Sequence, residues 1–180
     1  MRVLLLAGSV LSLCMPLRAW ACWEQAAQHY GLRADLLYAI ARVESNLNPL
    51  AVNRSHLQRT GSYDIGLMQI NSSHLGQLAR HGITEAQLYD PCTNIRVGAW
   101  LLAGNFSRQG ATWDAVGAYN AACSQLSSAA CARARASYAW KVFLNLPAHA
   151  APKQRVAASR DPSEGTLTTS PMQLAAKVSP

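Results

Sequence analysis

Glu44 is the residue of this sequence whose chemistry stands out, because it lies on the apolar side of a predicted helix. In LLYAIARVESNLNP (36–49), apolar residues recur at helical spacing, and Leu37, Ala41 and Glu44 follow one track. At about 100° per residue, Glu44 lies within roughly 20° of Leu37. An apolar surround raises the pKa of a carboxyl because it disfavours the charged form. Glu44 is therefore a candidate general acid that keeps its proton near neutral pH.

Cleavage of a glycosidic bond needs such an acid to protonate the departing oxygen, together with stabilisation of an oxocarbenium-like centre. Many enzymes of this class use a second carboxylate, and Asp64 in GSYDIGLMQINSS (61–73) is the candidate. A structural role for Asp64, in the turn that begins at Gly61, stays open beside this one. For Glu44, the structural alternative is an ion pair with Arg42 or Arg54.

Two further motifs follow Glu44 and Ser45 along the chain, GLMQ at 66–69 and AYN at 118–120. Each motif is weak alone, but the ordered set is specific. It resembles the lytic transglycosylases of the soluble-transglycosylase-like family, which have the goose-type lysozyme-like fold. The resemblance covers nearly all of residues 22–146. It is closest to the small specialised members that accompany secretion, conjugation and pilus systems.

This resemblance implies a peptidoglycan lytic transglycosylase that cleaves the β-1,4 bond between N-acetylmuramic acid and N-acetylglucosamine. A single glutamate, here Glu44, acts first as acid and then as base toward the C6 hydroxyl of the same muramic acid. A 1,6-anhydro ring closes, with the acetamido oxygen of the substrate stabilising the intermediate and no cofactor or second carboxylate needed. The implied purpose is to open the wall locally for a secretion, conjugation or pilus apparatus.

The resemblance also assigns substrate contacts. The residues concerned are Ser45, Gly66, Met68, Gln69, Tyr119, Asn120 and Tyr138. Gly66 would allow close backbone approach, Met68 would offer an apolar wall, and Gln69 would turn its amide toward the sugar. Tyr119 and Asn120 would form another wall, by stacking on N-acetyl sugars and hydrogen-bonding to them.

Tyr138 begins a Y-x-x-x-V pattern in the last predicted helix, and by resemblance its hydroxyl would contact Glu44 and support the protonated acid. Structural alternatives remain for three of these residues. Ser45 would satisfy backbone groups at the helix end, Met68 would be a buried core residue, and Tyr138 would belong to a helical core stripe.

Two other functions stay open on the sequence. One is a lysozyme-type hydrolase that uses water and Asp64, and the other is a non-catalytic peptidoglycan-binding assembly protein. The chain departs from larger family members by having Asn71-Ser72 in place of a proline and Cys123 in place of a glycine. Neither departure removes an expected catalytic group.

The domain that holds these residues is predicted to be mainly α, with at most a small β element. Apolar periodicity and Gly or Pro stop signals predict helices over 23–30, 35–48, 73–80, 91–109, 112–120 and 131–146. Strand propensity is confined to YDIGLMQI (63–70), which would form a short extended pair at most.

Both ends of the chain differ from this domain. Residues 1–21 have the layout of a secretory signal peptide, with Arg2, a short apolar run and the small-x-small site Ala19-Trp20-Ala21, which predicts export to the periplasm. A retained membrane anchor or a lipoprotein at Cys22 is disfavoured, because the run is too short to span a bilayer and Trp20 is bulky. Residues 147–180 have few large apolar side chains and read as a disordered tail, with a short helix at 172–178 as the alternative.

Four cysteines follow the predicted leader, and an even number in an exported chain implies disulfides. Three pairings are open, and we favour Cys123–Cys131, which closes a short loop, together with Cys22–Cys92. A metal site is disfavoured, because no C-x-x-C occurs and the five histidines are scattered.

The formal charge of +7 is spread along the chain. Residues 22–146 contain ten Lys or Arg and seven Asp or Glu, so this domain carries only +3. It lacks a basic run with interleaved aromatic residues, which argues against nucleic-acid binding. We expect a monomer that binds peptidoglycan strands, with components of a trans-envelope apparatus as further candidate partners.

Overall fold

The computed structural model describes residues 16–121, 123 and 126–147, which form a mainly helical domain with one small sheet. The helices are α1 (Pro16–Tyr30), α2 (Ala34–Ser45), α3 (Leu57–Thr60), α4 (Leu75–Ala79), α5 (Pro91–Gln109), α6 (Trp113–Asn120) and α7 (Ser128–Leu144). Two 3-10 turns, η1 (Ser72–His74) and η2 (Ala86–Tyr89), and three strands, β1 (Val52–Asn53), β2 (Asp64–Ile65) and β3 (Ile70–Asn71), complete this part of the chain.

The sheet is antiparallel in the order β1-β2-β3, with Val52 opposite Ile65 and Asp64 opposite Asn71. The predicted extended pair within 63–70 is confirmed as β2 and β3. Strand β1 was not predicted, because two residues are too few to show a period of two in the sequence.

All six predicted helices are present, with shifted ends. Helix α1 begins at Pro16, where a proline is well tolerated at the first helical position, so the helix includes the last residues of the predicted leader. Helix α7 begins at Ser128 because the Ser127 side chain accepts a hydrogen bond from the N–H of Ala130 and caps it. The short α3 and η2 were not predicted, because elements of four residues depend on tertiary packing.

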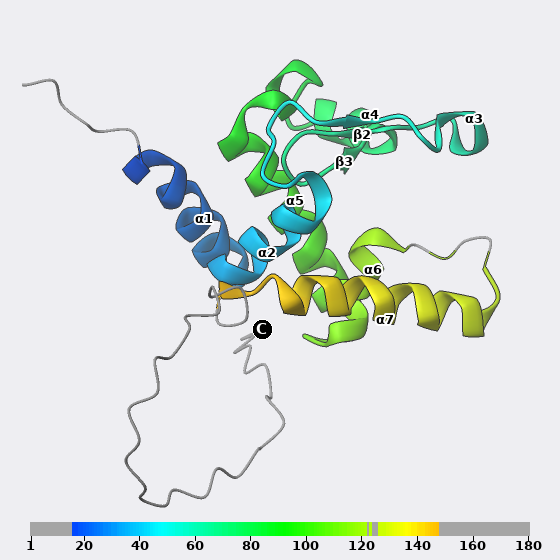
Figure 1. The fold of residues 1–180 in the computed structure, drawn as a ribbon. Coiled ribbons are helices and arrows are strands. Elements are labelled where there is room, and N and C mark those ends of the chain that lie inside the picture. Colours follow the sequence, from blue (N-terminus) through cyan, green and yellow to red (C-terminus); the bar gives the residue numbers. More distant parts are fainter. Residues whose placement is uncertain (1–15, 122, 124–125, 148–180) are drawn as a thin grey trace, which may run out of the picture.

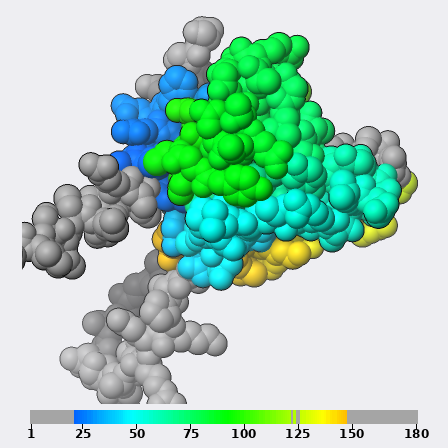
Figure 2. All heavy atoms as spheres, turned by 90° about the horizontal axis from the view of Figure 1, so that it is seen from above, coloured from blue at the N-terminus to red at the C-terminus, as the bar shows by residue number. Residues whose placement is uncertain are grey.

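Helix α2 lies at the centre of the helical part and packs against α1, α5 and α7 (Figure 1). Its Leu37, Ala39, Ile40 and Ala41 are fully buried. The small sheet follows α2 in the chain and is drawn above it, next to α4 (Figure 1). The segment that follows α2 and the region from α4 to η2 form one continuous surface in the view from above, with α7 along its lower edge (Figure 2).

Both favoured disulfides are confirmed. Cys22–Cys92 joins α1 to the first turn of α5, and Cys123–Cys131 joins the segment after α6 to the first turn of α7. The second bridge lies just beyond Tyr119 and Asn120, so it ties the end of α6 to the helix that carries Tyr138.

Residues 148–180 of the predicted tail, including the candidate helix at 172–178, and residues 1–15 of the predicted leader lie outside the described residues. Among the helices that the structure does describe, none is both long enough and apolar enough to cross a membrane.

Candidate active site

Glu44 lies in the last turn of α2 and is half-buried. The helix ends here because Asn46 adopts the left-handed conformation (φ 52°), while its N–H donates to the carbonyl of Arg42. Asparagine accepts this conformation more readily than most residues. The helix end therefore places the Glu44 carboxyl where the buried face of α2 reaches the sheet and α7.

The pKa of Glu44 is raised to about 7, chiefly by burial and to a smaller extent by the negative charge of Asp64. A hydrogen bond from Tyr138 and the positive charge of Lys141 act in the opposite direction, and burial outweighs them. The raised pKa expected from the apolar track is thus present in the structure. Among the described residues Glu44 forms no salt bridge, and the guanidinium of Arg54 instead lies 5.3 Å from the ring centroid of Tyr63.

The Tyr138 hydroxyl donates a hydrogen bond to Oε1 of Glu44. The contact implied by the resemblance is therefore present, and Tyr138 is also a buried member of the core. Our expectation that this hydroxyl supports the protonated acid is wrong. A donor stabilises the carboxylate more than the acid, so the contact lowers the pKa of Glu44. Burial and the charge of Glu44 raise the pKa of Tyr138 itself, so its hydroxyl keeps its proton.

Ser45 connects the end of α2 to the turn between β2 and β3. Its hydroxyl donates to the Leu67 carbonyl at 2.7 Å and accepts from the N–H of Asn48 at 3.1 Å. The structural role left open for Ser45 is therefore present, and it fixes the residue next to Glu44 against the GLMQ turn.

Gly66 and Gln69 shape that turn with left-handed backbone angles, φ 75° and 50°. The Gln69 side-chain nitrogen donates to the carbonyl of Gly66 at 2.8 Å and to that of Ala51 at 3.2 Å. The nitrogen of this amide therefore stabilises the turn itself.

Met68 is fully buried. Its side chain packs on α5 at Gly98, where an added Cβ would come within 2.5 Å of the Met68 sulfur. The expectation of an apolar wall toward the sugar is wrong for this side chain, and the core alternative holds. Met68 still serves the site through its backbone, because its carbonyl accepts a hydrogen bond from Tyr119 at 3.0 Å.

Tyr119 and Asn120 end α6 beside α7. Tyr119 is half-buried, Asn120 is exposed, and burial and the charge of Glu44 raise the pKa of Tyr119. The two helices approach closely at Gly117, where an added Cβ would lie 2.5 Å from the carbonyl oxygen of Arg135. This contact brings Tyr119 to the same side of the molecule as the Glu44–Tyr138 pair.

Asp64 lies in strand β2. Its carboxylate accepts from the side-chain amide of Asn71 at 2.7 Å and from that of Asn53 at 3.4 Å, and His56 Nε2 is 3.6 Å away. These partners hold Asp64 within the sheet, so its structural role is in strand β2 and not in the turn that begins at Gly61, where the structural alternative had placed it. The negative charge of Asp64 nevertheless raises the pKa of Glu44, so the two carboxyl groups interact electrostatically.

Two residues that influence the site were not predicted from the sequence: Asn94, which binds the GLMQ turn, and Lys141, whose charge lowers the pKa of Glu44. Asn94 is fully buried on α5 and accepts a hydrogen bond from the N–H of Met68 at 2.7 Å. The available signal was a polar residue directly before the apolar stripe that begins at Ile95. Lys141 lies one turn after Tyr138 on α7, a spacing that the sequence does show.

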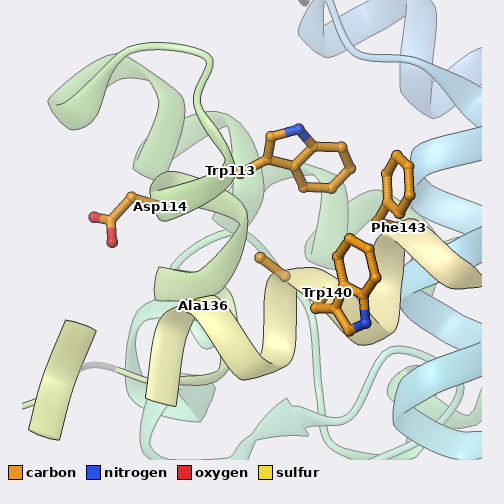
Figure 3. Close-up of a pocket in the computed structure, with 6 residues that line it drawn as sticks. Trp113, Asp114, Ala136, Trp140 and Phe143 are labelled. Carbon is orange, nitrogen blue, oxygen red and sulfur yellow. The ribbon is translucent and has the colours of Figure 1, made fainter. Parts of the chain in front are cut away.

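A hollow of about 350 Å³ lies between α6 and α7 and is lined by none of the predicted site residues. Trp113, Trp140 and Phe143 gather there, with Trp140 and Phe143 stacked at 5.2 Å between ring centroids (Figure 3). Asp114 points away from the rings and pairs with Arg135 at 2.7 Å (Figure 3). Within the described ranges, no three His, Cys, Asp or Glu side chains lie together as a metal site requires.

Comparisons with known proteins agree with this fold. The chain is 45% identical over 129 residues to the invasion protein IagB of Salmonella typhimurium, covering 71% of this chain and 76% of the relative. It is 36% identical over 141 residues to a peptidoglycan-binding-like protein of Escherichia coli, covering 76% and 82%.

The lytic transglycosylase Slt of Pseudomonas aeruginosa, solved as an inactive mutant, superposes with a TM-score of 0.57 at 23% identity. The match covers 74% of this chain and 24% of Slt, so it shows a shared fold over about a quarter of that protein. The model of the transglycosylase SLT domain matches residues 21–140, which include Glu44, the GLMQ turn and Tyr138. The chain therefore belongs to the transglycosylase SLT domain family.

Proposed function

We propose that the chain is a peptidoglycan lytic transglycosylase with Glu44 as its catalytic acid. The observation that carries the proposal is the Glu44 carboxyl itself, which is half-buried at the end of α2, has a pKa raised to about 7 and accepts a hydrogen bond from Tyr138. Membership of the family supports peptidoglycan as the substrate, as does the relative named for peptidoglycan binding.

In the first step, protonated Glu44 gives its proton to the oxygen between C1 of N-acetylmuramic acid and C4 of N-acetylglucosamine. The C1–O bond breaks, N-acetylglucosamine leaves as an alcohol, and C1 carries positive charge shared with the ring oxygen. The acetamido oxygen of the substrate and the negative charge of Asp64 stabilise this centre. The hydrogen bond from Tyr138 favours the carboxylate form that Glu44 now has.

In the second step, the Glu44 carboxylate takes the proton of the C6 hydroxyl while that oxygen bonds to C1. The 1,6-anhydro ring closes, Glu44 is protonated again, and no water is consumed. A pKa near 7 suits both roles, because the group must give and take a proton at similar pH.

The sugar contacts in this proposal come from residues around the pair. Ser45 and the GLMQ turn supply polar backbone and side-chain groups, including Oε1 of Gln69. Tyr119 and the exposed amide of Asn120 lie at the end of α6, and we assign them to an N-acetyl sugar. The buried side chain of Met68 makes no contact with the sugar in this proposal.

A lysozyme-type hydrolase is the second candidate, and the charge of Asp64 felt at Glu44 is the observation that favours it. In that reaction a water replaces the C6 hydroxyl, so the product has a reducing end. The two reactions therefore differ in product and not in the acid.

Digestion of purified sacculi tests the proposal. The disulfide-bonded protein, the Glu44→Gln variant and a Glu24→Gln control at an exposed position of α1 are incubated with sacculi, and the released sugars are identified by mass spectrometry. Anhydro-muropeptides released by the wild type and the control, but not by Glu44→Gln, support the proposal. Reducing-end products contradict it in favour of hydrolysis, and binding without release by folded protein favours a non-catalytic assembly protein.

We further propose export to the periplasm with removal of residues 1–21, action as a monomer, and local opening of the wall for a secretion, conjugation or pilus apparatus. The two disulfides and the relative named as an invasion protein support this setting. Protein recovered from the periplasm should begin at Cys22, bonded to Cys92 and without a lipid, in N-terminal sequencing and mass spectrometry. A retained leader or a lipid on Cys22 would contradict the proposed processing.

A further inference from the structure

Asn94 occupies the inside of the turn that joins β2 and β3. Its side chain is fully buried, and Oδ1 accepts a hydrogen bond from the N–H of Met68 at 2.7 Å. Its Nδ2 group donates to the carbonyl of Ile65 at 3.0 Å and to that of Leu88 at 2.7 Å. One amide from α5 thus holds both sides of the turn and the adjoining η2.

The three backbone groups that Asn94 satisfies need both a donor and an acceptor, because a buried backbone group without a partner costs free energy. A carboxamide supplies one acceptor oxygen and two N–H donors on a short, planar side chain. A leucine supplies neither, and an ionised aspartate supplies only acceptors.

The turn has no room for a side chain at Gly66, where it approaches Asn94 and Leu88. A Cβ added to Gly66 would lie 2.6 Å from the Leu88 carbonyl and closer still to the Asn94 amide. The next two carbonyls of the turn are held from elsewhere, by Ser45 at Leu67 and by Tyr119 at Met68. Residues from α2, α5 and α6 therefore fix consecutive backbone groups of the same turn.

We propose that Asn94 is a positioning residue for the reaction at Glu44, acting through the turn between β2 and β3. It sets the orientation of Gln69 and of the Leu67 carbonyl that holds Ser45 beside Glu44. This inference rests on the proposed function, because it assigns Asn94 to the same site.

Asn105 offers a matched control on the same helix. It is also a buried asparagine, but its side chain donates to the carbonyl of Ala115 at 3.3 Å and accepts from Arg108 at 2.7 Å. Asn105→Leu therefore removes buried hydrogen bonds of α5 without touching the turn. Asn94→Leu and Asn105→Leu are made in the full exported chain and compared at a temperature where both remain folded.

We expect Asn94→Leu to speed hydrogen exchange at the Met68 amide by at least ~10-fold, since a lost buried hydrogen bond has about that effect on a local equilibrium. We also expect kcat for release of sugars from sacculi to fall by at least ~10-fold, with a smaller change in KM. Asn105→Leu should leave the turn's exchange and kcat near the wild-type values.

Asn94→Asp provides a rescue test. The aspartate keeps an oxygen for the Met68 N–H, and when protonated it regains one donor for a turn carbonyl. Protection of the Met68 amide in this variant, relative to the wild type at the same pH, should therefore be greater at pH ~5 than at pH ~8. A merely space-filling role for Asn94 would give no such pH dependence.

Equal loss of kcat in Asn94→Leu and Asn105→Leu, or unchanged exchange at Met68 in Asn94→Leu, would overturn the inference. If the wild type releases no anhydro-muropeptides, the proposed function fails separately. The positioning role is then decided by affinity for sacculi in pelleting assays with the Glu44→Gln background. Asn94→Leu, but not Asn105→Leu, should weaken that affinity, and equal affinities would overturn it.

Discussion

The Tyr138 hydroxyl on α7 donates a hydrogen bond to the Glu44 carboxyl on α2, across 94 residues of sequence. The contact lowers the pKa of Glu44, whereas burial raises it more strongly, and the balance lies at about 7. The site therefore combines a surround that keeps the acid protonated with a donor that stabilises the carboxylate once the proton has left. Both forms are needed in the proposed reaction.

Removal of this donor should change the pH profile. In Tyr138→Phe the pKa of Glu44 should rise, so the alkaline limb of the kcat profile should move to higher pH. The maximum rate should fall by ~10-fold or more, because a hydrogen bond to the catalytic carboxylate is lost. Rates of sugar release from sacculi between pH ~5 and pH ~9 measure both effects.

Tyr63→Phe is the matched control, because Tyr63 donates to a different glutamate, Glu85, at 2.8 Å. Its profile should coincide with that of the wild type. A Tyr138→Phe profile that is merely scaled down, with the alkaline limb unmoved, would show that the hydrogen bond does not set the pKa of Glu44.

The raised pKa of Glu44 also affects stability. Because the folded-state pKa lies above the ordinary value of 4.5, the folded protein keeps a proton that the unfolded chain releases as pH rises. The contribution to the free energy of unfolding is thus fully present below pH ~4.5 and is lost by pH ~7. The loss is at most about 3 kcal/mol, from a pKa shift from 4.5 to about 7.

Glu44→Gln cannot ionise and should escape this loss. Urea unfolding at pH ~5 and pH ~8 should show the variant gaining stability relative to the wild type as pH rises. Parallel behaviour of the two proteins over that range would mean that Glu44 titrates with an ordinary pKa.

Asp64→Asn should lower the pKa of Glu44, because the Asp64 charge raises it. The alkaline limb should therefore move to lower pH, in the direction opposite to Tyr138→Phe. The rate should fall by roughly 10–100-fold, since a charge that stabilises the cationic centre is removed. The asparagine still presents an oxygen to Asn71, so the sheet is retained.

The product of Asp64→Asn should remain the anhydro sugar, identified by mass spectrometry. Asp114→Asn is the control, because Asp114 pairs with Arg135 of α7 and its charge is not among those that shift the pKa of Glu44. A complete loss of rate accompanied by reducing-end products in the wild type would favour the hydrolytic reaction.

Gly66→Ala should be strongly destabilising. The residue has φ 75°, and an added Cβ would meet the Leu88 carbonyl at 2.6 Å. Strain and overlap together should cost about 2–4 kcal/mol in urea unfolding. Gly61→Ala has a similar φ of 68° but open space around it, so it should cost only ~1 kcal/mol. Equal costs at the two positions would show that the overlap with the Leu88 carbonyl adds nothing to the backbone strain at Gly66.

Much of the fold was predictable because the signals are local. Helical periodicity and stop residues located the helices, and the apolar track from Leu37 placed Glu44 on the buried face of α2. Elements of two to four residues, such as β1 and α3, were not predictable, because the contacts that stabilise them are distant in sequence.

The site was predicted by residue type better than by orientation. Met68 was expected at the sugar and is buried against Gly98, while the Gln69 nitrogen is used inside its own turn. Side-chain direction in a turn depends on backbone angles and on the neighbouring helix, which a short motif does not contain. Asn94 was missed for the same reason, since two of its three partners lie 26 and 29 residues away.

By itself, the sequence determined a mainly helical domain and a glutamate on an apolar helix face, because spacing along one chain segment is enough for each, while three cysteine pairings stayed open until the structure paired Cys22 with Cys92 and Cys123 with Cys131. Only the tertiary structure decided that Tyr138 lowers the pKa of Glu44 while burial and Asp64 raise it. A pKa depends on solvent exclusion and on every charge nearby. Solvent exclusion and the nearby charges arise only when α2, α7 and the sheet pack together, and no one of these elements has them alone.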